Sequence, residues 1–205
     1  MWSYEKRLQY PVNITTPNAK LAEVIISQYG GPDGEMGASM RYLSQRYGVP
    51  YPEIAAVLTD IGTEELAHLE MVAAIVHQLT KNLSMEEIEN SGFKAYYVDH
   101  TIGIWPQAAG GIPFNACEFQ SKGDLITDLF EDMAAEQKAR TTYDNILRMI
   151  KDPEVCDPIR FLRQREVVHF QRFGEALRLL QEKLDSKNFY ICNPEFDTNC
   201  GCNCK

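Results

Sequence analysis

Two of the four histidines in this 205-residue chain stand three residues after a glutamate. Glu65 and His68 form one pair, and Glu166 and His169 form the other. On an α-helix, a separation of three residues places both side chains on one face. A carboxylate and an imidazole on one helical face are suitable ligands for a divalent transition metal. One such pair is a weak signal, but these two pairs share a longer pattern.

The longer pattern occurs twice at a fixed offset. It consists of a lone glutamate, a tyrosine seven residues later, and a Glu-x-x-His pair that starts 30 residues after the lone glutamate. The members are Glu35, Tyr42, Glu65 and His68 in the first copy, and Glu136, Tyr143, Glu166 and His169 in the second. Each member of the second copy follows its counterpart by 101 residues (136 − 35 = 101). Because the halves otherwise align poorly, the sequence indicates a positional pseudo-repeat rather than a demonstrated duplication.

The glutamates and histidines of the pseudo-repeat stand among apolar neighbours, so they are expected to face the protein interior. Four buried carboxylates without partners would repel one another or take up protons. Two divalent cations would offset that charge. A Glu from each of two helices and a Glu-x-x-His from each of two others is a dinuclear pattern of four-helix bundles. Surface glutamates with two packed histidines would explain either pair alone, but not the repeated set.

The two tyrosines of the pseudo-repeat are expected to face the same interior as the glutamates. Tyr42 and Tyr143 are candidates for donating hydrogen bonds to metal-ligating carboxylates. Ordinary packing of tyrosine rings in the core is the alternative.

Helical periodicity places the pseudo-repeat on four helices. The first is expected from Ala19 to Tyr47, with a break at Gly30–Gly34, and the second from Pro52 to about Lys81. The third is expected from Asp124 to about Lys151, and the fourth from near Pro158 to about Lys187.

Residues 82–122, between the second and third helices, are rich in glycine and proline. They predict a short helix around Met85–Asn90 and an otherwise irregular connection. Two helix pairs joined by one long connection form a ferritin-like bundle. The sequence therefore predicts an all-α fold with three parts: an N-terminal arm (1–17), a ferritin-like four-helix bundle with a dinuclear metal site (18–187), and a Cys-rich C-terminal tail (188–205).

Composition narrows the possible partners. The formal net charge of −9 argues against nucleic acid, because binding to a phosphate backbone requires a basic face. The apolar runs are too short for a membrane span. The first residues contain no apolar stretch typical of a secretory signal, so synthesis in the cytoplasm is expected.

Four segments of the chain resemble the manganese catalase family, especially its short members found in bacterial spore coats. They are Tyr29–Glu35, Asp60–His68, Asp132–Arg140 and Arg165–His169. Supporting similarity extends from about Tyr10 to Leu184. The resemblance implies a homo-oligomeric enzyme with a di-manganese site that cycles between di-Mn(II) and di-Mn(III) and disproportionates hydrogen peroxide into water and oxygen.

The resemblance also implies roles for individual residues. The implied metal ligands, one glutamate among them bridging both metals, are Glu35, Glu65, His68, Glu136 and His169. Glu166 would be a carboxylate outside the ligand set that moves protons during peroxide cleavage. The chain departs from the family at its C-terminal region, which is shorter than in full-length members. It also has Ala135 where some members carry an arginine near the substrate channel.

Other polar residues near the pattern are expected to have no metal role. Glu64 and Glu70 are predicted to point away from the ligand face, toward solvent. His77 is predicted to lie off the ligand stripe, and His100 lies in the long connection.

The six cysteines are unevenly distributed. Cys117 and Cys156 are isolated and are interpreted as small buried or half-buried thiols. The other four crowd into the tail: Cys192, Cys200, Cys202 and Cys204. With the spore-coat resemblance, they are interpreted as cross-linking sites to other coat proteins once the surroundings become oxidising. Binding of a soft metal by the tail is the alternative.

Two functions compete with a manganese catalase. One is a di-iron oxidase or peroxidase of the same fold, because carboxylate and imidazole ligands do not separate manganese from iron. The other is a structural spore-coat protein that retains its metals for stability and assembles through its tail.

Overall fold

The computed structural model of the chain describes residues 7–101 and 103–184. The described part is helical, with one isolated β-bridge between Gln107 and Pro113. The α-helices, in chain order, are α1 Ala19–Ile25, α2 Ser27–Gly30, α3 Glu35–Gln45, α4 Pro52–Thr80, α5 Met85–Glu89, α6 Lys94–His100, α7 Leu125–Met149 and α8 Pro153–Lys183. Two 3₁₀ turns accompany them, Arg46–Gly48 and Ala116–Phe119.

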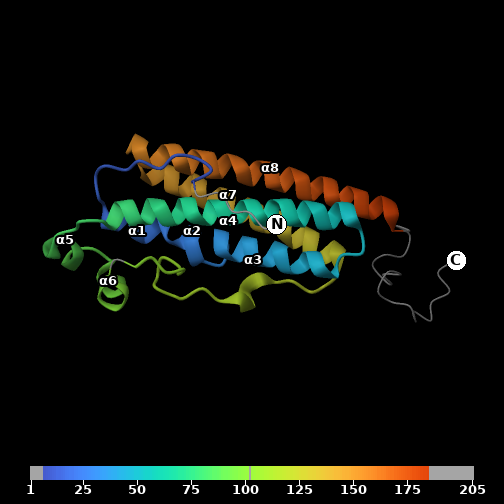
Figure 1. The fold of residues 1–205 in the computed structure, drawn as a ribbon, viewed down its shortest axis with the longest axis horizontal. Coiled ribbons are helices and arrows are strands. Elements are labelled where there is room, and N and C mark those ends of the chain that lie inside the picture. Colours follow the sequence, from blue (N-terminus) through green and yellow to red (C-terminus); the bar gives the residue numbers. More distant parts are fainter. Residues whose placement is uncertain (1–6, 102, 185–205) are drawn as a thin grey trace.

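Four long rods run side by side along the molecule (Figure 1). One rod is formed by α1, α2 and α3 in succession, and the other three are α4, α7 and α8. Helix α3 packs mainly on α4, and α7 packs mainly on α8, while contacts between α4 and α8 and between α3 and α7 join the two pairs. The predicted all-α, ferritin-like four-helix bundle is therefore confirmed.

Two glycines permit close approaches within this architecture. A Cβ atom on Gly62 of α4 would lie 2.9 Å from Cγ of Leu43, so glycine lets α3 and α4 pack tightly. A Cβ atom on Gly30 would overlap backbone atoms of Pro106 and Gln107. The long connection therefore passes directly over the point where the first rod is interrupted, as its course beneath α1–α3 in Figure 1 also shows.

The connection between α4 and α7 contains more helix than the single short helix predicted from the sequence. Helix α5 confirms the expected short helix, and Ser84 and Glu87 form a capping box at its start. The expectation that the rest is irregular is wrong at α6 and at the 3₁₀ turn Ala116–Phe119. Helix α6 forms because Phe93 and Tyr96, three residues apart, turn their rings to one side and are buried against the bundle.

The start of the fourth rod also differs from the prediction. Helix α8 begins at Pro153, whereas Pro158 was expected near its start and instead lies inside the helix. Asp152 is the N-cap, since its Oδ1 accepts a hydrogen bond from the Glu154 N–H at 2.9 Å. Proline is well suited to the first helical position, so Asp152 and Pro153 together set the earlier start. The predicted helix end near Lys187 and the Cys-rich tail lie outside the described residues.

The interior consists of two apolar clusters with a polar zone between them. The first cluster includes Ile25, Met71, Ile75, Ile146, Ile159 and Leu162. The second includes Ile54, Leu58, Ile61, Leu129, Phe173 and Leu177. In α4, the stretch between Ile61 and Met71 separates the two clusters and contains the first Glu-x-x-His pair. None of the described helices has the length and apolarity needed to cross a lipid bilayer.

Candidate metal centre

The polar zone in the middle of the bundle collects all six glutamates and histidines of the pseudo-repeat. None of them is more than 2% exposed. The helices that supply them are α3 (Glu35), α4 (Glu65 and His68), α7 (Glu136) and α8 (Glu166 and His169). Residues from four helices and both halves of the chain therefore meet at one place, between the two apolar clusters.

Four of these residues form a first polar set: Glu35, Glu65, His68 and Glu166. Each of them offers one potential ligand atom, and these atoms all lie within 4.8 Å of one another. Nδ1 of His68 is 2.7 Å from Oε2 of Glu65 and 3.8 Å from Oε2 of Glu35. This spacing is short enough for one cation to contact all of them.

A second polar set consists of Glu65, Glu136 and His169, and meets the same distance criterion. Nδ1 of His169 is 2.6 Å from Oε1 of Glu65 and 3.5 Å from Oε2 of Glu136. Glu65 thus belongs to both sets, with Oε2 facing His68 and Oε1 facing His169. A carboxylate that offers one oxygen to each of two sets has the geometry of a bridging ligand.

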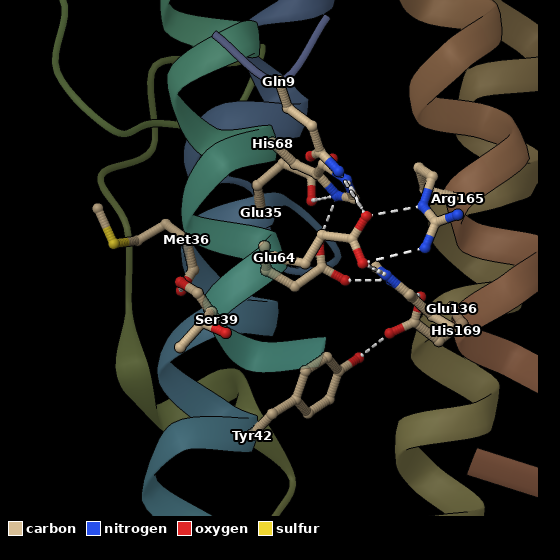
Figure 2. A network of polar contacts seen from close by, with 12 residues as sticks. Gln9, Glu35, Met36, Ser39, Tyr42, Glu64, His68, Glu136, Arg165 and His169 are labelled. Atoms are coloured by element: carbon tan, nitrogen blue, oxygen red, sulfur yellow. Dashed lines mark hydrogen bonds and ion pairs between the residues drawn. The ribbon is translucent and has the colours of Figure 1, made fainter. Parts of the chain in front are cut away.

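The two tyrosines of the pseudo-repeat contact the lone glutamates crosswise. The Tyr42 hydroxyl, on α3, donates a hydrogen bond to Oε1 of Glu136 at 2.5 Å (Figure 2). The Tyr143 hydroxyl, on α7, donates to Oε1 of Glu35. Both tyrosines are fully buried, and the ring of Phe173 packs edge-on against Tyr42. Each tyrosine therefore orients the carboxylate that comes from the other half of the chain.

Burial and mutual repulsion shift the pKa values of the carboxylates at the centre. Burial, followed by the charge of Glu65, raises the pKa of Glu35 to about 8 and also raises the pKa of Glu136. Burial and the neighbouring carboxylates hold the pKa of Glu166 well above its usual range. Burial would raise the pKa of Glu65 too, but the adjacent His169 and His68 outweigh burial and lower it. Without metals, therefore, the centre carries protons at neutral pH.

The pKa values of His68 and His169 are shifted in the opposite direction to those of ordinary buried imidazoles. Burial alone would lower both pKa values, because it disfavours the charged form. The charge of Glu65 and hydrogen bonds to the surrounding glutamates outweigh burial. They hold the pKa of His68 well above its usual range and raise that of His169 to about 12. In the absence of metals, protons on the histidines balance the carboxylate charge.

Several buried atoms of the centre have no hydrogen-bond partner. They include Oε1 of Glu65, Oε2 of Glu136, Oε1 of Glu166 and Nδ1 of His169. The 2.6 Å contact between Glu65 and His169 lacks the angles of a hydrogen bond. Buried polar atoms are normally satisfied, and carboxylate oxygens with imidazole nitrogens are typical ligands of divalent manganese, iron and zinc. The residues therefore fit a pair of divalent cations.

Glu64 does not point into solvent, so the prediction made for it from the sequence is wrong. Its side chain is 16% exposed, with Oε2 lying 3.1 Å from Nε2 of His169 and Oε1 lying 3.7 Å from Nε2 of His68. Glu64 precedes His68 by four residues, which also places it on the histidine's face. Its counterpart in the pseudo-repeat is Arg165, 101 residues later, and the two form an ion pair. This opposite-charge pair at equivalent positions was a signal that could have identified both residues.

The other secondary candidates lie apart from the centre. Glu70 is exposed, as predicted from the sequence, and His77 is exposed too. The ring of His100 stacks on Trp105, and its Nε2 is 3.2 Å from Asp99. Among the described residues, the two polar sets include none of these three.

The two cysteines within the described bundle also differ from each other. Cys117 is an exposed free thiol, so the expectation that it is buried or half-buried is wrong, whereas Cys156 is buried as expected and packs in the first apolar cluster. Neither belongs to a polar set at the centre.

A ferritin-like bundle with a buried centre of glutamates and histidines defines a class of dinuclear metalloproteins. The family model described as "Manganese containing catalase" matches residues 1–190 of the chain. The chain therefore belongs to the manganese-containing catalase family, and the resemblance noted from its four sequence segments is confirmed.

Individual relatives agree with this membership. The chain is 50% identical over 190 residues to Protein CotJC of Bacillus subtilis, covering 93% of this chain and 100% of the relative. It is 33% identical over 193 residues to a probable manganese catalase of Clostridium acetobutylicum, covering 93% and 86%, respectively. The solved structure of KatB, a manganese catalase from Anabaena, superimposes with a TM-score of 0.82 at 31% identity, covering 90% of this chain and 83% of KatB.

Proposed function

We propose that this chain is a dinuclear manganese catalase, which converts two molecules of hydrogen peroxide into two of water and one of oxygen. The observation that carries the proposal is the meeting of four buried carboxylates and two buried imidazoles between two apolar clusters. Membership of the manganese-containing catalase family supports manganese as the metal.

The two polar sets suggest how the ligands are divided. Glu35 and His68 would hold one manganese ion, Glu136 and His169 the other, and Glu65 would contact both. Bound manganese would supply the electron transfer that oxidises one peroxide and reduces another.

The protein's own side chains neutralise and orient this centre. Tyr42 and Tyr143 each fix one oxygen of a lone glutamate, which leaves the other oxygen to face the interior. The ionised form of Glu65, favoured by both histidines, supplies negative charge between the two metal positions. The ligand geometry is therefore largely set before any metal binds.

Glu166 is proposed as the proton-handling group. It is 2% exposed, its Oε1 has no hydrogen-bond partner, and burial together with the neighbouring carboxylates raises its pKa. Peroxide cleavage requires a proton to move between oxygen atoms, and a carboxyl group beside the reacting oxygens can accept and return that proton. The position of Glu166 in the first polar set suits this role.

The proposal extends to where the enzyme is used. The chain covers the full length of Protein CotJC, as expected for a short member of the family. We propose a homo-oligomer made in the cytoplasm and deposited in the spore coat. There the tail cysteines, Cys192, Cys200, Cys202 and Cys204, would cross-link other coat proteins. These cysteines lie outside the described residues.

The test combines metal analysis with oxygen evolution, on protein produced separately in manganese- and iron-supplemented media. We expect two manganese ions per chain and rapid oxygen release from hydrogen peroxide. Activity with iron alone would favour the di-iron alternative. Two metals with no oxygen release would favour a structural coat protein, and assembly of that protein should then fail when residues 189–205 are deleted.

A further inference from the structure

Glu64 connects three separate parts of the chain at the edge of the metal centre. It lies on α4, and it contacts His169 and Arg165 of α8 as well as His68 of its own helix. Nε2 of Gln9, from the N-terminal arm, donates a hydrogen bond to Oε1 of Glu64 at 2.7 Å. Figure 2 shows Glu64 between these groups, with Arg165 on one side and His68 and Gln9 on the other.

The two imidazoles are arranged alike around this carboxylate. Their Nδ1 atoms face Glu65, at 2.7 Å for His68 and 2.6 Å for His169. Their Nε2 atoms face Glu64, at 3.7 Å and 3.1 Å respectively. The rings stack with centroids 5.4 Å apart and planes inclined by 21°. One carboxylate therefore lies on the outer side of both rings, and another lies between them on the inner side.

We propose that Glu64 is a positioning residue for both histidines: it accepts the Nε2–H of His169 at 3.1 Å and faces Nε2 of His68 at ion-pair distance, 3.7 Å, and so leaves both Nδ1 lone pairs directed at the metals. The inference rests on the proposed metal centre. A metal-ligating histidine usually donates its second N–H to a carboxylate or carbonyl, which fixes the tautomer and the ring orientation. Here a single carboxylate serves two ligands, so the two metal positions are coupled through it.

Glu64 is itself held in a fixed orientation. Nε of Arg165 is 2.7 Å from Oε1 of Glu64, and Nη2 donates to Oε2 at 3.0 Å. This two-point ion pair keeps the carboxylate plane facing both rings. Gln9 adds a third contact from the arm. The arm thereby becomes part of the support of the metal centre.

Glu64, His68 and His169 could alternatively be read as a metal site of their own, because their ligand atoms are mutually close. A metal at that position would bind both Nε2 atoms. If the inner metals bind the Nδ1 atoms, each imidazole would then have to lose both protons. Hydrogen bonding to Glu64 requires no such step, and the cationic Arg165 beside the carboxylate also disfavours a cation there.

The first test measures manganese affinity by equilibrium dialysis of the full chain. The variants are E64Q, which keeps the shape but not the charge, and E64L, which removes both acceptor oxygens. The control is E70Q, at an exposed glutamate of the same helix. Removing such a supporting contact typically weakens metal binding about 10–100-fold. We expect a loss in this range for E64L, a smaller loss for E64Q, and none for E70Q. Wild-type affinity in E64L would overturn the inference.

The second test needs no metal and therefore separates this inference from the proposed function. In metal-free protein labelled with ¹⁵N-histidine, the Nε2–H proton of His169, which is hydrogen-bonded to Glu64, should exchange slowly with solvent in the wild type and in E70Q. It should exchange rapidly in E64L. Rapid exchange in the wild type, or unchanged protection in E64L, would refute the role of Glu64. Absence of manganese binding by the wild type would refute the proposed function instead.

Discussion

Manganese binding should release protons, because the centre holds protons where the metals would be bound. At pH 7, a group with a pKa of about 8, as for Glu35, is roughly 90% protonated. The histidines also carry an extra proton, since the pKa of His68 is well above its usual range and that of His169 is about 12. Glu65 contributes none, because its pKa is lowered.

The size of the effect follows from these three groups. Metal ligation requires a free lone pair, so Glu35, His68 and His169 should each lose one proton, and the raised pKa of Glu136 can only add to the release, which gives at least about three protons for two metals. The overall binding constant for the pair of metals should then fall at least roughly 1,000-fold for each pH unit below about 7.5. The sign is fixed: groups with raised pKa values hold their protons more firmly as the pH falls, and so compete better with the metals.

The assay is calorimetric titration of metal-free protein with manganese, between pH 6 and 7.5, in two buffers that differ in ionisation enthalpy. The difference between the apparent enthalpies gives the number of protons released. The exposed-site variant E70Q should behave as the wild type does. A manganese affinity that does not change with pH, with no proton release, would show that these residues are not the ligands.

Three further changes have defined outcomes. Y143F removes the donor to buried Glu35 and should cost the metal-loaded protein about 1–3 kcal/mol in a urea titration; no loss relative to Y47F, at an exposed tyrosine, would contradict that contact. E166Q should keep both metals but release oxygen about 100- to 10,000-fold more slowly; full activity would exclude proton transfer by Glu166, and loss of the metals would make it a ligand. D152A removes the N-cap of α8 and should cost about 1 kcal/mol, whereas unchanged stability would mean that the cap contributes nothing.

Spacing along the chain was enough to find the principal residues of the centre. A residue pattern at helical spacing fixes which side chains share a face, and its recurrence after 101 residues indicated that two halves contribute equally. The crosswise contacts, Tyr42 with Glu136 and Tyr143 with Glu35, could not be read in the same way. They depend on how α3 crosses α7, which is a property of packing between helices rather than of either helix.

The environment of Glu64 and the start of α8 depend on residues outside the local pattern of one helix. Glu64 is adjacent to Glu65, so it was placed on the outer face, but α8 covers that face and brings Arg165 and His169 to it. At α8, Pro158 was taken as the start signal, although Asp152 and Pro153 form a capped start, with Pro153 five residues before Pro158 (158 − 153 = 5). For Glu64, packing of the neighbouring helix α8 decides the environment. For the start of α8, the capping residue Asp152 decides where the helix begins.

The most direct test of a dinuclear centre bridged by Glu65 is a crystal structure of the manganese-loaded chain, with anomalous diffraction measured on both sides of the manganese absorption edge. We expect two manganese peaks between the apolar clusters, one contacted by Glu35 and His68 and the other by Glu136 and His169, with Glu65 bound to both. A single peak, or two peaks without Glu65 between them, would contradict the proposed centre.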